Sequence, residues 1–289
     1  MKKVIILIGI LVASFAVSIA ANRALIIGIG KYKTDTGWKD IHGDADVELL
    51  KPKLEKHSFI VRALVNEQAT KEAIQKALIQ LKEECQFGDK VYFHFSGHGQ
   101  PITDVNGDED NAQDEAMIPY DAGKYYIEGV YEGENHLIDD EYNQILADIK
   151  RKIGKRGEVF IAVDACHSRG MERGENEVDD IQILNSARGT DDAFTFDGEI
   201  PYSLESNPLP QSLNVGAKLI VISACKEDER NYEYKSATGK MYGSLSYCIA
   251  ELLKKDANFN RWTEYFQNEE YRKQKIFQTS QHPSVVIYD

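Results

Sequence analysis

Short runs of β-branched and aromatic residues alternate along the chain with longer amphipathic stretches. The short runs predict strands at 24–29, 59–65, 90–96, 158–164, 218–223 and 284–288. The stretches between them repeat apolar residues at helical spacing and predict helices at 44–56, 70–84, 139–152 and 242–255. Strands that alternate with helices are typical of an α/β fold in which a mostly parallel sheet of about six strands carries helices on both faces.

Two long segments, 100–137 and 167–215, break this alternation and show no clean period. Irregular segments of this length are uncommon inside an α/β unit and are usually functional or flexible. Each segment follows the C-terminal end of a predicted strand, which is the edge where open parallel sheets place their binding crevices. We therefore expect the functional site at this edge.

The N-terminus has the layout of a secretory signal peptide. Lys2 and Lys3 precede an apolar run at 4–17, and small residues stand at Ser18 and Ala20. We expect cleavage near Ala20 and an exported protein, either periplasmic or secreted, with no stable membrane span after cleavage. An uncleaved anchor is the alternative, because the apolar stretch is nearly long enough to cross a bilayer.

Charge narrows the range of partners. Without Lys2 and Lys3 the chain has 32 basic residues against 47 acidic ones, a formal net charge of −15. Such an acidic surface argues against nucleic acids and anionic membranes as partners and suits basic peptides or cations. The four cysteines show no CxxC spacing, so a zinc ribbon or a thioredoxin-type site is not indicated.

A histidine and a cysteine follow two consecutive predicted strands. Residues 90–96 lead into Gly97-His98-Gly99, and residues 158–164 lead into Ala165-Cys166. An imidazole close to a thiol raises its thiolate fraction and later protonates the leaving amine. The backbone N–H groups of Gly99 and Cys166 are candidate oxyanion donors if the two turns face each other. A buried thiol beside a structural histidine is the alternative.

The two segments that carry these residues resemble the signature motifs of the caspase and metacaspase clan. They read Phe95-Ser96-Gly97-His98-Gly99 and Asp164-Ala165-Cys166-His167-Ser168. Residues 106–119 are similar to the metacaspase segment after the catalytic histidine, and 221–225 resemble more loosely the start of the small-subunit region. The likeness covers about 23–253 and is nearest to a bacterial metacaspase.

This resemblance implies a caspase-like three-layer sandwich and a division of the chain. After the signal peptide, residues 21–289 would form a single peptidase domain, with a large half at 21–168 and a small half at 215–289. The segment 169–214 would be the linker between them. Arg169, Arg173 and Arg188 lie in it, so an enzyme that cleaves after arginine would find candidate sites for self-cleavage there.

The resemblance also assigns roles to individual residues. His98 would be the base and Cys166 the nucleophile of a thiol endopeptidase that forms a thioester. The pocket for the residue before the cleaved bond would hold Asp44, Ser96 and Asp164 and accept arginine or lysine. Caspases proper carry glutamine in place of Asp164 and cleave after aspartate. Asp44 and Asp164 each have a second interpretation, Asp44 as a helix cap and Asp164 as a solvated group at a strand end.

Calcium is a candidate cofactor, and the resemblance implies no other. Aspartates that bind calcium in one group of metacaspases match Asp114, Asp139 and Asp140 in this chain. A further aspartate of that group has no clear counterpart, although Glu172 or Glu175 could replace it. A solvated acidic loop is the alternative interpretation.

We expect a monomer that acts on peptide or protein substrates with basic residues. Two alternatives stay open: a catalytically silent calcium- or peptide-binding module on the same fold, and a cysteine-dependent transpeptidase.

Overall fold

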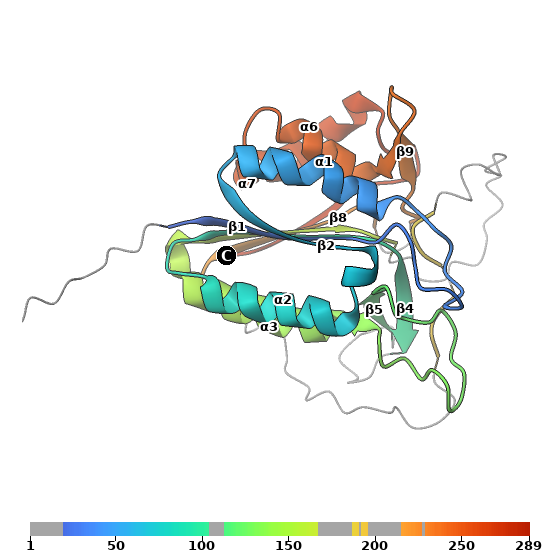
Figure 1. The fold of residues 1–289 in the computed structure, drawn as a ribbon. Helices are drawn as coiled ribbons and strands as arrows, with labels where there is room; N and C mark the ends of the chain where they lie inside the picture. The colour runs from blue at the N-terminus through green and yellow to red at the C-terminus, as the bar shows by residue number, and fades with distance from the viewer. Residues whose placement is uncertain (1–19, 104–112, 167–186, 191, 196–214, 227–228) are drawn as a thin grey trace, which may run out of the picture.

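A computed structural model of the protein describes residues 20–103, 113–166, 187–190, 192–195, 215–226 and 229–289. Its central strands are β1 (Asn22–Gly28), β2 (Phe59–Val65), β3 (Lys90–Ser96), β7 (Glu158–Asp164), β8 (Lys218–Ser223) and β11 (Ser284–Tyr288). They form one six-stranded sheet in the order β11-β8-β7-β3-β1-β2 (Figure 1). Only the edge strand β11 is antiparallel to its neighbour within this sheet.

Helices cover both faces of the sheet, so the expected three-layer α/β sandwich is confirmed (Figure 1). One face carries α1 (Gly43–Lys56), α6 (Ser244–Leu252) and α7 (Phe259–Gln267), and the other carries α2 (Lys71–Glu84) and α3 (Asp139–Ile153). Successive side chains of a strand point to opposite faces. On β3, Tyr92 accordingly packs in the core under α1, α6 and α7, whereas Phe93 packs in the core over α2 and α3.

The segment 100–137, expected to be irregular, contains a small antiparallel sheet. Its strands are β4 (Gly99–Thr103), β5 (Gln113–Met117) and β6 (Leu137–Ile138). The chain leaves β3 through a short turn at 97–98 and enters β4 directly. A second small sheet pairs β9 (Glu233–Lys235) with β10 (Met241–Gly243), and β10 takes the residues at which we expected the last helix to begin.

Helix α7 was not expected from the sequence, although its pattern is amphipathic. Phe259, Trp262 and Phe266 are buried along one side of the helix at spacings of three and four residues. Asn258 caps the helix by accepting a hydrogen bond from the N–H of Arg261 at 3.1 Å. The helix is only nine residues long, which is why its periodicity is hard to recognise.

Residues 1–19, the expected signal peptide, lie outside the described part of the chain. Among the described helices none is both long and apolar enough to cross a membrane.

We expect Trp262→Ala to lower the free energy of unfolding by about 3–5 kcal/mol. Trp262 is 1% exposed, and its ring packs edge-on against Phe160 on β7 and lies 5.4 Å from the Phe259 ring. Urea denaturation followed by circular dichroism measures the change. The exposed Tyr125→Ala is the control, with an expected change within about 0.5 kcal/mol. Equal changes in the two variants would contradict this assignment of the core.

Candidate active site

His98 and Cys166 lie on two turns that face each other at one edge of the sheet. Their strands, β3 and β7, are neighbours in parallel register, with Ser96 opposite Asp164. The N–H of Gly97 donates to the Asp164 carbonyl at 3.3 Å. A side chain at residue 99 would place its Cβ 2.0 Å from the Cys166 carbonyl oxygen, so only glycine allows this approach.

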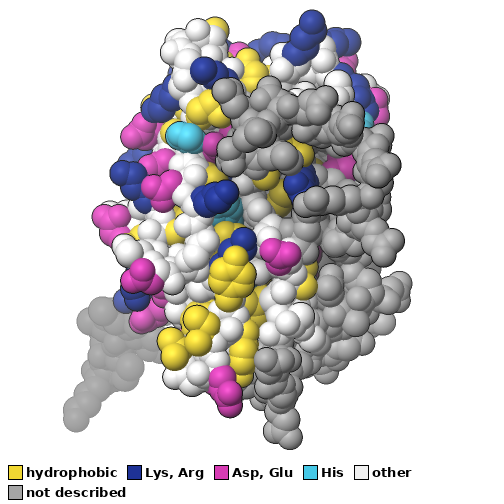
Figure 2. Space-filling model, turned by 90° about the vertical axis from the view of Figure 1, so that its right-hand side faces the viewer, with side chains coloured by type: hydrophobic (Ala, Val, Ile, Leu, Met, Phe, Trp, Pro, Cys, Tyr) yellow, Lys and Arg dark blue, Asp and Glu magenta, His cyan; other side chains and the backbone are white. Residues whose placement is uncertain are grey.

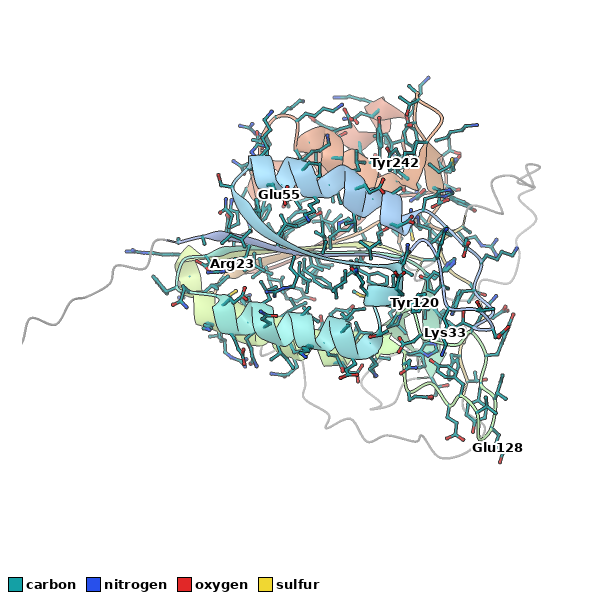
Figure 3. All side chains as sticks on the ribbon, viewed as in Figure 1. Arg23, Lys33, Glu55, Tyr120, Glu128 and Tyr242 are labelled. Atoms are coloured by element: carbon teal, nitrogen blue, oxygen red, sulfur yellow. The ribbon has the colours of Figure 1, made fainter. Side chains whose placement is uncertain are left out.

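The loop after β1 orients the His98 ring. Its Nε2 lies 2.8 Å from the Lys39 carbonyl, which can only accept, so Nε2 carries the proton in neutral His98. The Trp38 ring stacks on the imidazole with centroids 4.8 Å apart. The Lys33 N–H bonds the Tyr120 carbonyl and thereby fixes this loop to the segment after β5 (Figure 3). These contacts hold one ring orientation and one tautomer.

The remaining nitrogen of His98 suits a general base. Nδ1 is buried, has no hydrogen-bond partner among the described residues, and is unprotonated in this tautomer. Burial lowers the pKa of His98 from 6.5 to about 4. The imidazole is therefore neutral around pH 7 and able to accept a proton.

The thiol of Cys166 is covered by two backbone segments. The Asn231 N–H donates to Sγ at 3.0 Å. A side chain at Gly189 would place its Cβ 2.5 Å from the Cβ of Cys166. The backbone at Gly189 therefore lies directly against the cysteine, and the cysteine is 1% exposed.

The carbonyl oxygen of Arg188 accepts from both amides that the sequence identifies as oxyanion donors. The distances are 3.2 Å from the Gly99 nitrogen and 2.8 Å from the Cys166 nitrogen. The Arg188 N–H in turn donates to the Asn231 carbonyl at 3.0 Å. A residue of the expected linker thus lies with its carbonyl where an oxyanion hole would bind a substrate.

The Arg188 side chain is fully buried in a pocket of three carboxylates, which we call the acidic pocket. Its Nη2 bonds Asp46 at 2.9 Å and Glu233 at 3.0 Å. Its Nη1 bonds the Ser96 hydroxyl and lies 3.8 Å from the Asp164 carboxylate. Charged side chains are almost never buried in this way unless they are paired.

Two expected residues of the acidic pocket, Ser96 and Asp164, contact Arg188, but Asp44 does not. The Asp44 carboxylate bonds the Asn66 amide at 3.2 Å and its neighbour's backbone N–H at 2.9 Å. It therefore stabilises the loop before α1. Asp46, two residues further along the same helix, takes the place that we expected for Asp44.

Besides Asp46, sequence reasoning missed Glu233 and Asn231. Both follow β8 in a segment without a recognisable motif. The side-chain amide of Asn231 donates to Asp164 at 2.8 Å. Glu233 is held from behind by His42, which approaches it through its backbone nitrogen at 2.8 Å and Nδ1 at 2.7 Å.

A chain of hydrogen bonds behind Asp164 fixes its carboxylate. Asp164 accepts from the hydroxyl of Ser246 at 2.6 Å and from its N–H at 2.7 Å, in the first turn of α6. Because that hydroxyl donates to Asp164, it accepts from Nε2 of His94 at 3.0 Å. Nδ1 of His94 then accepts from Tyr92 at 2.8 Å. The chain requires a neutral His94.

Asp46 is the carboxylate most affected by burial. Burial raises its pKa to about 7, although the Arg188 guanidinium acts in the opposite direction. The negative charge of Asp164 raises it further. Even with the guanidinium in place, the acidic pocket therefore holds its full negative charge only above neutral pH.

Comparison with known proteins identifies the family. The family described as caspase domain matches residues 21–286, almost the whole chain after the expected signal peptide. The chain belongs to the caspase-domain family of cysteine peptidases.

Relatives of this caspase domain include plant metacaspases. It is 31% identical over 195 residues to Metacaspase-3 of Arabidopsis thaliana and 27% identical over 190 residues to Metacaspase-1 of the same plant. These matches cover 64% and 65% of this chain but only 44% and 45% of the relatives. The chain thus spans less than half the length of these curated relatives.

Solved structures support the fold of the caspase domain. A crystal structure of a protein from Geobacter sulfurreducens superposes with a TM-score of 0.60 at 18% identity and covers 93% of both chains. Caspase-1 of Spodoptera frugiperda superposes with a TM-score of 0.53 at 11% identity, covering 92% of this chain and 88% of its own.

Among the described side chains of this caspase domain, no group of three or more His, Cys, Asp or Glu is placed to hold a metal ion, and the calcium prediction stays a prediction. Asp139 begins α3, and Asp114 lies on β5 and Asp140 on α3, but the side chains of these last two are outside the described set. The candidates Glu172 and Glu175 are also outside it, as are Arg169 and Arg173. Arg188 is the self-cleavage candidate that the structure describes.

We expect the free energy of unfolding of this caspase domain to decrease as the pH falls below 6.5, partly because of His94. Burial lowers its folded-state pKa from 6.5 to about 4. Between these values the unfolded chain binds more protons, so stability is full above pH 6.5 and is lost as the pH falls, by about 3 kcal/mol at pH 4.

His94→Gln keeps a donor and an acceptor but cannot titrate. We therefore expect a shallower decrease in unfolding free energy between pH 6.5 and pH 4, measured by urea denaturation. His98 and His136 are present in both proteins, so their contributions cancel when the pH dependence of one protein is subtracted from that of the other. Identical slopes would show that His94 does not stay neutral in the folded state.

Proposed function

We propose that this chain is a cysteine endopeptidase that hydrolyses peptide bonds after a basic residue, with arginine preferred over lysine. The observation that carries the proposal is the placement of Arg188. Its guanidinium lies among Asp46, Asp164 and Glu233, and its carbonyl lies on two backbone amides beside Cys166. Arg188 therefore serves as a model of how the arginine of a substrate would bind.

The chemistry follows from these contacts. Nδ1 of His98 takes the proton of Cys166, and Sγ attacks the carbonyl carbon of the basic residue. The N–H groups of Gly99 and Cys166 stabilise the oxyanion. His98 then protonates the leaving nitrogen, the C–N bond breaks and a thioester forms. Water hydrolyses the thioester with His98 as base, which releases a carboxylate and restores the thiol.

The acidic pocket favours arginine over lysine for a geometric reason. One terminal nitrogen of Arg188 reaches two carboxylates, Asp46 and Glu233, and the other reaches Ser96. A guanidinium presents both nitrogens in a fixed plane, whereas lysine has a single nitrogen on a flexible stem. Acidic residues are rejected by charge. This supports peptides with basic residues as the substrate class.

The same placement supports self-processing at one of the three candidate bonds. The bond between Arg188 and Gly189 lies at the nucleophile in the intact chain, while Arg188 fills the acidic pocket. Cleavage there would separate residues up to 188 from 189–289 and free the pocket from its own arginine. In this proposal the intact chain is a precursor with an occupied site.

We expect Asp46→Asn to lower kcat/KM for fluorogenic peptides ending in arginine by roughly 100-fold, because a charge-assisted contact to the guanidinium is lost. Asp44→Asn is the matched control on the same helix, with an expected change of less than about threefold. Peptides that end in lysine or in aspartate test the specificity. Assays with added calcium and with a chelator test the candidate cofactor. Cys166→Ala must abolish every cleavage.

A larger loss of kcat/KM in Asp44→Asn than in Asp46→Asn would refute the assignment of Asp46 to the acidic pocket. Cleavage after aspartate would keep the nucleophile but reject the basic specificity. If the folded protein cleaves none of the peptides, the result would favour a peptide-binding module. Transfer of the acyl group to an added amine would favour a transpeptidase.

We expect Arg188→Ala to prevent the appearance of a fragment that begins at Gly189. Arg188→Lys should slow its appearance by roughly tenfold or more, because lysine loses the two-carboxylate contact. N-terminal sequencing of the fragment measures the outcome, and Cys166→Ala is the uncleaved reference. Arg169→Ala and Arg173→Ala should leave this fragment unchanged. A fragment that begins at Gly189 in Cys166→Ala would show that another protease makes it.

A further inference from the structure

The chain that follows Arg188 does not leave the site but runs along β4. Bridges join Gly99 to Gly189 and Ile102 to Phe194, both in the parallel sense. Phe194 donates its N–H to the Pro101 carbonyl at 2.8 Å and accepts from the Thr103 N–H at 3.1 Å. Between the bridges β4 advances three residues and the segment advances five.

The Phe194 side chain fills an aromatic pocket, formed by Tyr126, Tyr131 and His136. The ring is 2% exposed. Its centroid lies 4.4 Å from that of His136, and the two tyrosine rings meet it edge-on at 5.9 and 6.3 Å. Edge-to-face packing of this kind adds specific stabilisation to the burial of an aromatic side chain.

Polar side chains beneath the ring bind the backbone of the same segment. The amide of Gln100, which is 1% exposed, donates to the Asp192 carbonyl at 2.9 Å. Its oxygen accepts from Nε2 of His136 at 3.0 Å, and Tyr131 donates to Nδ1 of the same ring at 2.8 Å. The aromatic pocket and this backbone contact are thus one connected network.

The direction of the chain relates this pocket to catalysis. Arg188 presents its carbonyl at Cys166, so residues from Gly189 onward occupy the leaving-group side of the cleaved bond. Gly189 packs so closely on Cys166 that a side chain there would collide. Phe194 lies six residues after Arg188 and pairs with Ile102, near the end of β4 away from Gly99.

Given the proposed peptidase activity, we propose that β4 and the aromatic pocket form a docking site for the part of a protein substrate that follows the cleaved bond. The site takes a small residue directly after the arginine and an aromatic side chain six residues after it. In the intact chain Gly189 and Phe194 occupy these positions. A polypeptide strand is the ligand, since β4 binds the backbone and the pocket binds one apolar ring.

The site lies at the edge of the molecule that carries the ends of the strands. Figure 2 shows hydrophobic side chains gathered in a vertical run on the lower half of this face. The segment after β5 exposes Tyr125, Ile127 and Val130, which are 57%, 52% and 75% exposed, and Tyr126 of this segment contributes to the aromatic pocket. Apolar surface therefore continues from the aromatic pocket toward solvent.

The test uses the full chain with Phe194→Ala, which vacates the aromatic pocket. Two internally quenched peptides copy residues 184–195, one with phenylalanine and one with alanine at the position of residue 194. We expect the phenylalanine peptide to be cleaved with at least tenfold higher kcat/KM, because burial of one aromatic ring supports a ratio of this size. A small arginine substrate with no residues after the fluorophore measures the intrinsic activity.

Two tyrosine variants of the Phe194→Ala chain test whether the preference for the phenylalanine peptide arises in the aromatic pocket. Tyr126→Ala should bring the ratio of the two peptides close to one, because it removes an aromatic wall. Tyr125→Ala, its exposed neighbour, should keep the ratio. Should Phe194→Ala not fold by circular dichroism, self-cleavage of chains that retain Phe194 gives a second measurement. Tyr126→Ala should then slow it at least fivefold relative to Tyr125→Ala, and equal rates would overturn the docking site.

A binding measurement separates this proposal from the peptidase activity. The inert double variant Cys166→Ala, Phe194→Ala should bind a labelled peptide of residues 189–195 at least tenfold more tightly than its alanine counterpart, by fluorescence anisotropy. Such a preference, together with no turnover of any peptide by the Phe194→Ala chain that keeps Cys166, would reject the peptidase and keep the docking site. Equal turnover and equal binding of the two peptides would overturn the docking site even if the small arginine substrate is cleaved.

Discussion

The structure of the site depends on one interaction, the burial of the Arg188 guanidinium among Asp46, Asp164 and Glu233. Removing four charged groups from water carries a large cost, which is recovered only when every partner has good geometry. Each carboxylate is accordingly held by further donors: Ser96 and the Gly243 N–H on Asp46, Ser246 and Asn231 on Asp164, and His42 on Glu233. The pocket thus joins β3, β7, α1, α6 and β9.

The sheet explains why these groups meet. Parallel strands in register place the ends of β3 and β7 side by side, so Ser96 and Asp164 lie opposite each other and the turns with His98 and Cys166 follow at once. The N–H groups at the start of α6 face the end of β7 and bind Asp164, where a helix N-terminus favours negative charge. The proposed nucleophile and base, together with Ser96 and Asp164 of the acidic pocket, therefore lie together because of one geometric feature, the common edge of adjacent strands.

The sequence predicts the residues of the site that lie at strand ends. It does not predict the residues that reach the site only through long-range contacts. Cys166, His98, Ser96 and Asp164 follow or end apolar runs whose limits agree closely with the strands. Asp44 and Asp46 both lie in the first turn of α1, and nothing local distinguishes the one that faces the sheet. Glu233 and Asn231 were missed because they lie in the short stretch from the end of β8 into β9, which reaches the site only through tertiary contacts. Strand β4 was missed because its five residues include Gly99 and Pro101, residue types that are uncommon inside strands.

The charge of the acidic pocket explains why its occupant must be a cation. Three carboxylates face one guanidinium, an excess of negative charge in a buried place, and burial together with Asp164 already raises the pKa of Asp46 to about 7 with the cation present. Without the guanidinium the repulsion between the carboxylates would grow, so they would take up a proton, admit water or bind another cation. In the proposed self-cleavage, exchange of Arg188 for the arginine of another substrate would satisfy this requirement without rearranging the fold. The same carboxylates that stabilise the intact chain would in this way select the next substrate.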